Sequence, residues 1–373
     1  MAQPYHLAGN PGSFLCFVAA EHTRFSTGTD EHGQKIWDKA QEEGLSVQDF
    51  VDKYAQRYKD FCKLFFIEYD NFYRTSDNSH HKAAQKFWEK CEEKGDIYKK
   101  RYSGRYCVGC ERYITEKELV DGKCPDHKTI PELKEEENYF FKLSRYAPIL
   151  IEALENENSP YHYRISPESK KTEVLAKLKA GINDLSISRA EVSWGIPVPW
   201  DKTQTVYVWV EALFNYYTAT KITGRGSFWP ADLHLLGKEI LWFHTVIWQA
   251  MLLSAGLDLP RKTYTHSFYM IDGQKMSKSL GNIISPQQLV DLFGVDGTRY
   301  LIAGSFPNKN DSDIGVERFK EKYNADLANN LGNLVSRVAK LSEGWQVEQK
   351  ESMTMDNRVV EKIDNLELDE ALG

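Results

Sequence analysis

The sequence predicts an α/β protein built on a Rossmann-like, doubly wound parallel sheet. Residues 24–29 (RFSTGT) form a predicted strand, residues 30–33 (DEHG) a polar turn at its carboxyl end, and residues 34–43 a helix. Strand, polar turn and helix make up the unit of such a sheet, and ligands gather at the carboxyl ends of its strands. A second half repeats this order, with predicted strands at 206–210 and 233–236 and predicted helices at 211–218 and 240–255.

Further helices are predicted where apolar residues recur at spacings of three and four. They cover residues 47–61, 81–94, 138–155 and the chain from residue 316 onward. Another helix should begin at Pro286, because Ser285 can act as its N-cap and proline suits the first helical position. Residues 99–134 are charged, predicted to be short-stranded, and carry three clustered cysteines, which indicates an insert between the two halves.

Composition excludes several classes of protein. The 373 residues suggest two or three domains, and 41% apolar with 27% charged residues is ordinary for a globular protein. A net charge of −7 argues against a strongly basic nucleic-acid footprint, although local basic patches remain possible. No apolar run is long enough for a membrane span. Residues 14–20 (FLCFVAA) lack a preceding Lys or Arg, so no secretory signal is predicted. The first ten residues contain neither Arg nor Ser, so no transit peptide is predicted there, which leaves an organelle location open.

The clustered cysteines predict a structural zinc site. Cys107 and Cys110 form a CxxC pair, and Cys124 and His127 form a CxxH pair 13 residues further on. This is tetrahedral zinc spacing, and four protein ligands leave no open position for chemistry. The alternative is three free cysteines and a surface histidine. The clustering also argues against a secreted disulfide framework and fits a reducing compartment. His80 and His81 have no comparable partners in the sequence and are expected at the surface.

The stretch DGQKMSKSLGN (272–282) places two lysines on a glycine-flanked loop. Lys275 and Lys278 can act as mobile point charges for phosphate, and glycines let the backbone approach a ligand. Positive charge that meets developing charge on phosphate oxygens stabilises a transition state. The alternative for an isolated K-x-x-K pair is a solvated surface turn.

The whole string resembles the mobile signature loop of class I aminoacyl-tRNA synthetases, whose lysines hold the ATP triphosphate. Other stretches resemble the methionyl-tRNA synthetase family, in the right order, over about residues 24–340. They are TGTDEHGQKI (27–36), DLSISR (184–189), WGIPVPW (194–200), YVWVEALFNY (207–216) and GKEILWFH (237–244). The resemblance implies that Lys275 and Lys278 are catalytic and bind ATP together with Gly237 and Lys238.

The same resemblance implies a methionine pocket. Its residues would be Asp30, Trp209, Ala212, Tyr216, Ile240, His244 and Trp248. Aromatic edges suit a thioether, a carboxylate suits the ammonium, and four-residue spacing puts Ile240, His244 and Trp248 on one helix face. Without the resemblance, these aromatic residues would be interpreted as core.

The chain also departs from the family. The family's N-terminal His-x-Gly-His signature, which binds ATP, is missing after residues 5–11, and the helical anticodon-binding bundle that starts near residue 316 would continue beyond residue 373. Glu211 and Glu239 stand where the family usually has Asp.

The resemblance implies a methionine–tRNA ligase that uses ATP with Mg²⁺, methionine and tRNA(Met), with a structural Zn²⁺ in the insert. Asn333 and Arg337, four apart on one helix face, would contact the anticodon, and ordinary helix polarity is the alternative. Because the signature is missing, a non-catalytic relative or splice form that binds tRNA or regulates is the second hypothesis. Another class I synthetase is the third.

The expected domains are residues 1–98 and 196–265 for the two catalytic halves, 99–195 for the insert, 266–315 for the signature-loop region and 316–373 for the start of the anticodon-binding bundle.

The motifs resemble eukaryotic mitochondrial enzymes, while the zinc insert looks bacterial, so a mitochondrial matrix is expected with a bacterial cytoplasm as alternative. A monomer or weak oligomer is expected.

Overall fold

The computed structural model describes residues 24–109, 112–114, 116–125, 128–190, 192, 194–222, 224, 226–276, 282–306, 310–346 and 356–372. These fall into two compact units. The first contains the described parts of Ala20–Lys63 and Glu68–Tyr264, and the second those of Leu64–Ile67 and Thr265–Gly373. The N-terminal stretches discussed above, up to residue 23, lie outside the described residues.

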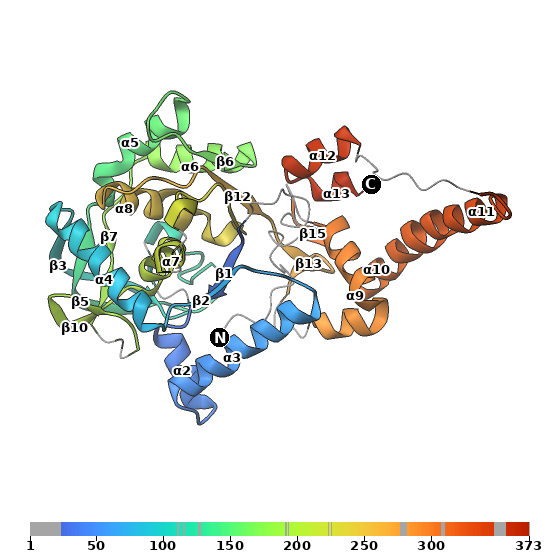
Figure 1. Cartoon of the computed structure of the whole chain (residues 1–373). Coiled ribbons are helices and arrows are strands. Elements are labelled where there is room, and N and C mark those ends of the chain that lie inside the picture. The colour runs from blue at the N-terminus through green and yellow to red at the C-terminus, as the bar shows by residue number, and fades with distance from the viewer. Residues whose placement is uncertain are drawn as a thin grey trace. The chain divides into compact units, whose positions relative to one another are not determined.

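The first unit begins with the predicted strand and helices (Figure 1). Strand β1 (Ser26–Thr29) pairs in parallel with β2 (Asn71–Arg74), and α2 (Gln34–Glu42) and α3 (Val47–Leu64) form the connection between them. Helix α4 (Asn78–Glu93) follows β2, so the predictions for 24–29, 34–43, 47–61 and 81–94 are confirmed. At Gly28 an added Cβ would lie 1.8 Å from the Tyr73 carbonyl oxygen, so only glycine fits this strand pair.

Helices α2 and α3 pack through a small apolar cluster. Ile36 and Ala40, four residues apart on α2, are buried against Val47, Phe50 and Val51 of α3. This is the stripe that an amphipathic helix pair requires. Before α2, Gly33 has a φ of 102°, which favours glycine, and its N–H donates to the Trp194 carbonyl at 3.1 Å.

The insert is an antiparallel ribbon. Strands β3 (Ile97–Cys107) and β5 (Glu132–Phe141) pair from Ile97 opposite Phe141 to Tyr106 opposite Glu132, flanked by β4 (Arg112–Ile114) and β7 (Leu185–Ser186). The prediction of helix over 138–155 was wrong at its start, because residues 138–141 end β5 and helix α5 spans Leu143–Glu155. The run Tyr139–Phe141 favours a strand, since aromatic residues fit a pleated surface.

A second set of elements completes this unit. One sheet has the strand order β11 (His234–Gly237), β12 (Lys262–His266) and β6 (Arg164–Ser166), and β12 is parallel to β6. Strands β8 (Ser188–Arg189), β10 (Asp201–Val206) and β9 (Pro197–Val198) form another. The strand predicted at 206–210 was wrong: β10 ends at Val206 and helix α7 runs from Val208 to Ile222. Helix α6 spans Glu168–Lys179.

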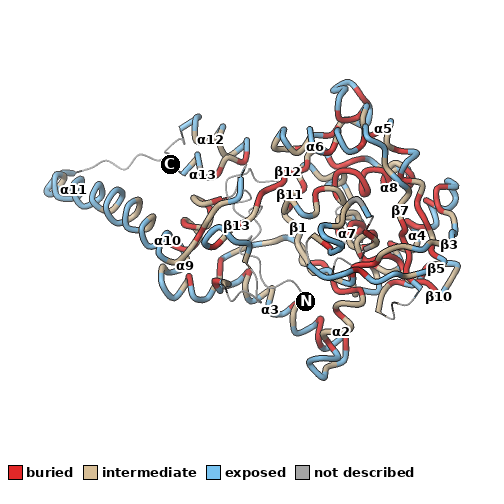
Figure 2. The backbone as a smooth tube through the Cα atoms, turned by 180° about the vertical axis from the view of Figure 1, so that it is seen from behind, coloured by how far each residue is buried: buried red, intermediate tan, exposed pale blue. Residues whose placement is uncertain are grey.

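The helix predicted at 240–255 is divided into three parts. A 3₁₀ turn (Lys238–Ile240) and a π-helical turn (Phe243–Ile247) precede α8 (Trp248–Ser254). Residues of α7 and α8 form the main core together with Trp88, Phe141 and Leu150. These three side chains are each at most 1% exposed. In Figure 2 the α8 segment is buried along nearly its whole length.

The second unit is mostly helical. Helix α9 (Pro286–Gly304) begins as predicted, because the Gln288 N–H donates to the Ser285 hydroxyl at 3.1 Å and Pro286 occupies the first turn. Hairpin β13 (Tyr269–Ile271) and β14 (Gln274–Lys275) pairs with β15 (Ser312–Asp313). Helix α10 (Val316–Lys322), a π-helical segment (Tyr323–Gly332) and α11 (Asn333–Leu341) follow one another, and α12 (Asn357–Asp364) and α13 (Leu368–Ala371) end the described chain. No described helix combines the length and the apolar character that crossing a membrane requires.

The close approach at Gly28 gives a stability prediction. Gly28→Ala should lower the free energy of unfolding by about 1–3 kcal/mol or more, because its methyl group must displace the Tyr73 backbone. Urea unfolding measures this change. Ser26→Ala, at an exposed position of the same strand, should change stability by no more than about 0.5 kcal/mol, and equal stabilities of the two variants would contradict the packing argument.

Candidate active site

A tyrosine–histidine pair joins two of the residues expected to line a methionine pocket, and of these His244 is buried and Tyr216 is half-buried. The Tyr216 hydroxyl on α7 is 2.8 Å from Nε2 of His244, and His244 Nδ1 is 2.9 Å from the Ile240 carbonyl oxygen. A carbonyl only accepts, so Nδ1 carries the proton, Nε2 accepts, and Tyr216 donates. Burial lowers the pKa of His244 to about 4 and raises the pKa of Tyr216 to about 12. The pair is therefore neutral at pH 7.

His234 packs against this pair, and no role was predicted for it from the sequence. Its ring lies 4.3 Å from the Tyr216 ring and 5.9 Å from the His244 ring, centroid to centroid. Burial, and next the neighbouring His244, lower the pKa of His234 to about 3. A histidine within the predicted buried strand 233–236 was the available signal, since a polar residue in a buried strand needs an explanation.

The other expected pocket residues divide into two groups. The Trp209 ring stacks on the Phe243 ring at 4.8 Å, and Trp209, Ala212 and Ile240 are half-buried. Trp248 is fully buried, and its ring neighbours within the described chain are the core residues Phe87, Phe214 and Trp229. The turn Phe243–Ile247 is π-helical, and its wider winding departs from the helical spacing on which a shared face of His244 and Trp248 was predicted.

Asp30 is exposed in the loop that follows β1. Its negative charge adds to burial in raising the pKa of Tyr216, so the carboxylate lies within electrostatic reach of the tyrosine–histidine pair. This is the arrangement expected of a group that accepts an ammonium beside an apolar side-chain pocket.

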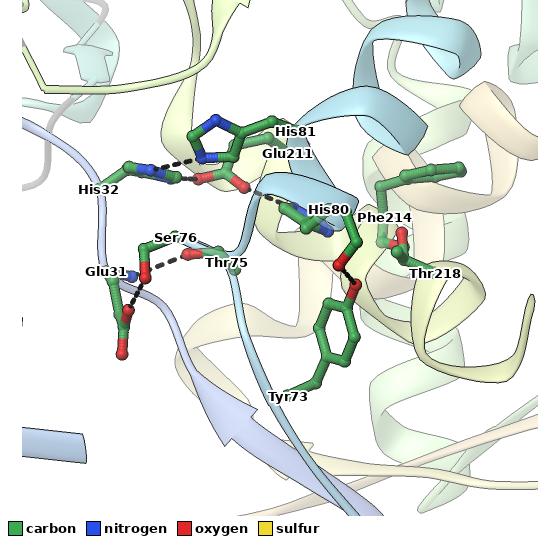
Figure 3. A network of polar contacts seen from close by, with 11 residues as sticks. Glu31, His32, Tyr73, Thr75, Ser76, His80, His81, Glu211, Phe214 and Thr218 are labelled. Carbon is green, nitrogen blue, oxygen red and sulfur yellow. Dashed lines mark hydrogen bonds and ion pairs between the residues drawn. The ribbon is translucent and has the colours of Figure 1, made fainter. Parts of the chain in front are cut away.

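The residue after Asp30 is anchored on several sides (Figure 3). The Glu31 carboxylate accepts hydrogen bonds from Thr29 Oγ1 at 2.5 Å, from Arg74 Nε at 2.7 Å and from the Ser76 hydroxyl. Its backbone N–H donates to Thr75 Oγ1 at 2.9 Å, and its carbonyl accepts from the Trp194 indole at 2.6 Å. The loop around Asp30 is thereby fixed at the end of β1.

A second network joins this loop to α4 and α7 (Figure 3). The Glu211 carboxylate lies 2.7 Å from His32 Nδ1 and 2.8 Å from His80 Nε2. The expectation that His80 lies at the surface was wrong, because its side chain is fully buried in this contact. His81 is half-buried, with Nε2 3.3 Å from His32 Nε2.

A small pocket of about 10 Å³ opens beside His32. Its lining includes Arg189 and Tyr207, and the Arg189 guanidinium lies 4.0 Å from the centroid of the Tyr207 ring. The stretches that resembled the family, DLSISR and WGIPVPW, thus contribute to one wall of the same region.

Of the expected ATP residues, Gly237 and Lys238 lie where β11 passes into the 3₁₀ turn. A Cβ on Gly237 would lie 2.5 Å from the Glu239 carboxylate, so that carboxylate covers the glycine. Lys275 belongs to the second unit, is exposed, and its Nζ lies 4.1 Å from the centroid of the Phe268 ring. Lys278 lies outside the described residues.

The hairpin that carries Lys275 has a fixed tip. Asp272 and Gly273 both have positive φ, at 51° and 71°, as a two-residue hairpin turn requires. Their N–H groups donate to the two carboxylate oxygens of Asp313, each at 3.0 Å.

Two of the four expected zinc ligands lie within the described chain. Cys107 and Cys124 are buried together with Ile114 in one small cluster, while Cys110 and His127 lie outside the described residues. Within the described part of the chain no three His, Cys, Asp or Glu side chains converge as a metal site. Asn333 and Arg337, the expected anticodon residues, are exposed on α11, where Asn333 Nδ2 donates to the Asn329 carbonyl at 2.6 Å.

A model of the family "tRNA synthetases class I (M)" matches residues 18–130 and 126–339, and the chain belongs to this family. It is 45% identical over 326 residues to "Methionine--tRNA ligase" of Caldanaerobacter subterraneus subsp. tengcongensis, which covers 86% of this chain and 50% of that protein. It is 44% identical over 323 residues to "Methionine--tRNA ligase, chloroplastic/mitochondrial" of Arabidopsis thaliana, covering 84% and 52%. The chain therefore spans about half the length of these relatives.

The fold is that of a solved relative. Mycobacterium tuberculosis methionyl-tRNA synthetase in complex with methionyl-adenylate matches with a TM-score of 0.87 and 35% identity, covering 98% of this chain and 76% of that one. The chain has the class I synthetase fold, with the mixed α/β architecture predicted from the sequence.

The buried neutral histidines predict a pH-dependent stability. His234 and His244 have folded pKa values of about 3 and 4, below the ordinary 6.5, so the unfolded chain binds more protons between about pH 4 and 6.5. The stability they contribute is present above pH 6.5 and is lost as the pH falls, by up to about 1.4 kcal/mol per pH unit for each histidine. Urea unfolding at pH 4.5, 5.5, 6.5 and 7.5 measures this. His234→Phe keeps an aromatic ring against Tyr216 and should make the profile shallower; an unchanged slope would contradict the assignment.

Proposed function

We propose that the chain is a methionine–tRNA ligase, which activates methionine with ATP and transfers it to tRNA. The observation that carries the proposal is the neutral Tyr216–His244 pair within electrostatic reach of Asp30. The names of the relatives and the methionyl-adenylate complex of the Mycobacterium protein support the same substrate.

The pocket suits a thioether amino acid. Because the Tyr216 proton is used by His244, the pair presents no charge to the bound side chain, and Trp209, Ala212 and Ile240 add half-buried apolar surface. Sulfur contacts with aromatic rings are favourable by about 0.3–1.5 kcal/mol. Asp30 would receive the ammonium. Trp248 would act from the core beneath the pocket, in keeping with its complete burial.

The reaction would proceed in two transfers. A methionine carboxylate oxygen attacks the α-phosphorus of ATP, the bond to the β-phosphate oxygen breaks, and pyrophosphate leaves. A ribose hydroxyl of tRNA then attacks the carbonyl carbon of the adenylate, loses its proton and releases AMP. Gly237, Lys238, Lys275 and Lys278, with Mg²⁺, would bind the phosphates. Exposure of Lys275 on an anchored hairpin supports this role, since phosphate groups require accessible positive charge.

A structural zinc in the insert is part of the proposal. Cys107 and Cys124 share one buried cluster although 16 residues lie between them in sequence, and thiolates are ligands that Zn²⁺ prefers. Cys110 and His127 would complete a Cys₃His set. When bound, the ion would link the end of β3 to the following loop and would take no part in the reaction.

The remaining assignments extend the family resemblance. We place tRNA anticodon contacts at Asn333 and Arg337, whose exposure on α11 leaves them accessible. We divide the chain at residues 98, 195, 265 and 315, and the boundary between the two compact units at Tyr264 and Thr265 supports one of these divisions. Relatives include bacterial and plant organelle proteins, and we favour the mitochondrial matrix and a monomer or weak oligomer.

Amino-acid-dependent exchange of pyrophosphate into ATP tests the function. The purified 373-residue chain should exchange with methionine and much more weakly with leucine or isoleucine. Tyr216→Phe should lower kcat/KM for methionine about three- to tenfold, because His244 loses its hydroxyl donor. Tyr217→Phe, on the same helix, is the control. Absence of exchange would favour the non-catalytic relative, and exchange driven by leucine would indicate another class I synthetase.

Metal analysis tests the zinc proposal independently of activity. The purified chain should contain about one zinc per molecule, and Cys107→Ser and Cys124→Ser should each lower that content. Chelation should lower Tm, because metal binding contributes folding free energy. Cys62→Ala, at a buried cysteine far away in sequence, should keep the metal. A zinc-free wild-type chain, or full zinc content in Cys107→Ser, would refute the site.

A further inference from the structure

Glu211 is a charged group placed where water cannot solvate it. Its side chain is fully buried in the first turn of α7, and each carboxylate oxygen has one imidazole partner. Burial by itself raises the pKa of Glu211, but His32 and His80 outweigh it and hold the pKa below its ordinary value. A buried carboxylate without such partners is destabilising by several kcal/mol. The contact is therefore a requirement of this fold.

The proton positions follow from the surrounding groups. Nδ1 of His80 is buried and has no hydrogen-bond partner among the described residues, so the proton of a neutral ring belongs on Nε2, where it donates to Glu211. His32 donates through Nδ1. Its other nitrogen faces His81. Burial, and next the electrostatic interaction with His32, lower the pKa of His81 to about 4. Both carboxylate oxygens thus accept, each from a different element.

The network acts on the loop that carries Asp30. His32 is two residues after Asp30, and the intervening Glu31 is tied to Thr75 and Trp194 by its backbone. On the other side, Glu211 adjoins Ala212 and lies two residues after Trp209. One carboxylate therefore sets the distance between the residue proposed to take the ammonium and the helix proposed to line the side-chain pocket.

We propose that Glu211, through His32 and His80, is a positioning residue for amino-acid binding, which fixes the Asp30 loop against the first turn of α7. This rests on the proposed function, because it assumes that Asp30 and α7 bind an α-amino acid. Glu211 does not touch the substrate itself. Its removal should weaken binding of the amino acid and leave binding of ATP nearly unchanged.

Glu211→Gln keeps the shape of the side chain but removes its negative charge and one of its two acceptor oxygens. The amide nitrogen would face an imidazole N–H, which places donor against donor. His80 could avoid this only by moving its proton to Nδ1, where no described residue accepts it. Glu211→Asp keeps both acceptors on a shorter arm. For His80, Gln can replace the Nε2 donor and Leu cannot, which gives a matched pair.

Calorimetric binding of methionine and KM values from pyrophosphate exchange test the proposal on the full chain. Glu211→Gln and His80→Leu should each raise Kd and KM for methionine tenfold or more, with KM for ATP changed less than twofold. Glu211→Asp, His80→Gln and Glu89→Gln, an exposed carboxylate on α4, should stay within about threefold of wild type. Wild-type methionine binding in Glu211→Gln, or equal rises in both KM values, would overturn the proposal.

A second readout keeps the two proposals distinguishable. If the wild-type chain does not bind methionine, the proposed function fails, and hydrogen exchange still tests the network. The amides of Glu31 and Gly33, which donate to Thr75 Oγ1 and to the Trp194 carbonyl, should exchange at least tenfold faster in Glu211→Gln than in wild type or Glu89→Gln. Unchanged exchange in Glu211→Gln would overturn the positioning role.

Discussion

The buried carboxylate of Glu211 is the constraint on which the arrangement of the candidate site depends. Its two partners, His32 and His80, are 179 and 131 residues away in sequence. None of the three elements can bury its polar group alone, because an unpaired carboxylate or imidazole in this interior would be strongly destabilising. The loop after β1, the start of α4 and the start of α7 must therefore come together as one unit. The same condition that stabilises the fold also places Asp30 beside α7.

Neighbouring groups give the buried histidines two different tasks. His32 and His80 face a carboxylate and serve as N–H donors, so they compensate a charge. His234 and His244 face a tyrosine ring and hydroxyl and each other, and burial keeps them neutral. Histidine thus has two roles. The neutral pair His234 and His244 forms an uncharged surface where an apolar side chain would bind, and His32 and His80 stabilise a buried carboxylate behind the loop where an ammonium would bind. Burial and partner identity, rather than residue type, decide the role.

Local patterns in the sequence predicted the elements whose signals are local. The strand at 24–29, the helices after it and the Ser285 cap follow from periodicity, turn residues and capping, all of which act within a few positions. Tyr216 and His244 were expected together from the family resemblance. His80 was misplaced because its partner Glu211 is remote in sequence. The π-helical turn before Trp248 was also not predicted, because the sequence pattern carries no marker for it. The strand ends at residues 141 and 206 depend on pairing with residues distant in sequence, and local hydrophobic periodicity holds no information about such pairing.

The lysine hairpin shows how a mobile charge can be delivered from a rigid base. Asp313 accepts from the amides of both turn residues, Asp272 and Gly273, so the turn is held by two charge-assisted hydrogen bonds. Lys275 follows the turn by two residues and rests over the Phe268 ring, a contact worth about 0.5–1 kcal/mol at an exposed site. That energy is small compared with the attraction between an ammonium and a polyphosphate, so in the role proposed for Lys275 a triphosphate would draw the lysine away while its backbone stays in place. An anchored turn with a weakly held cation therefore suits the phosphate-binding role that we propose for this hairpin.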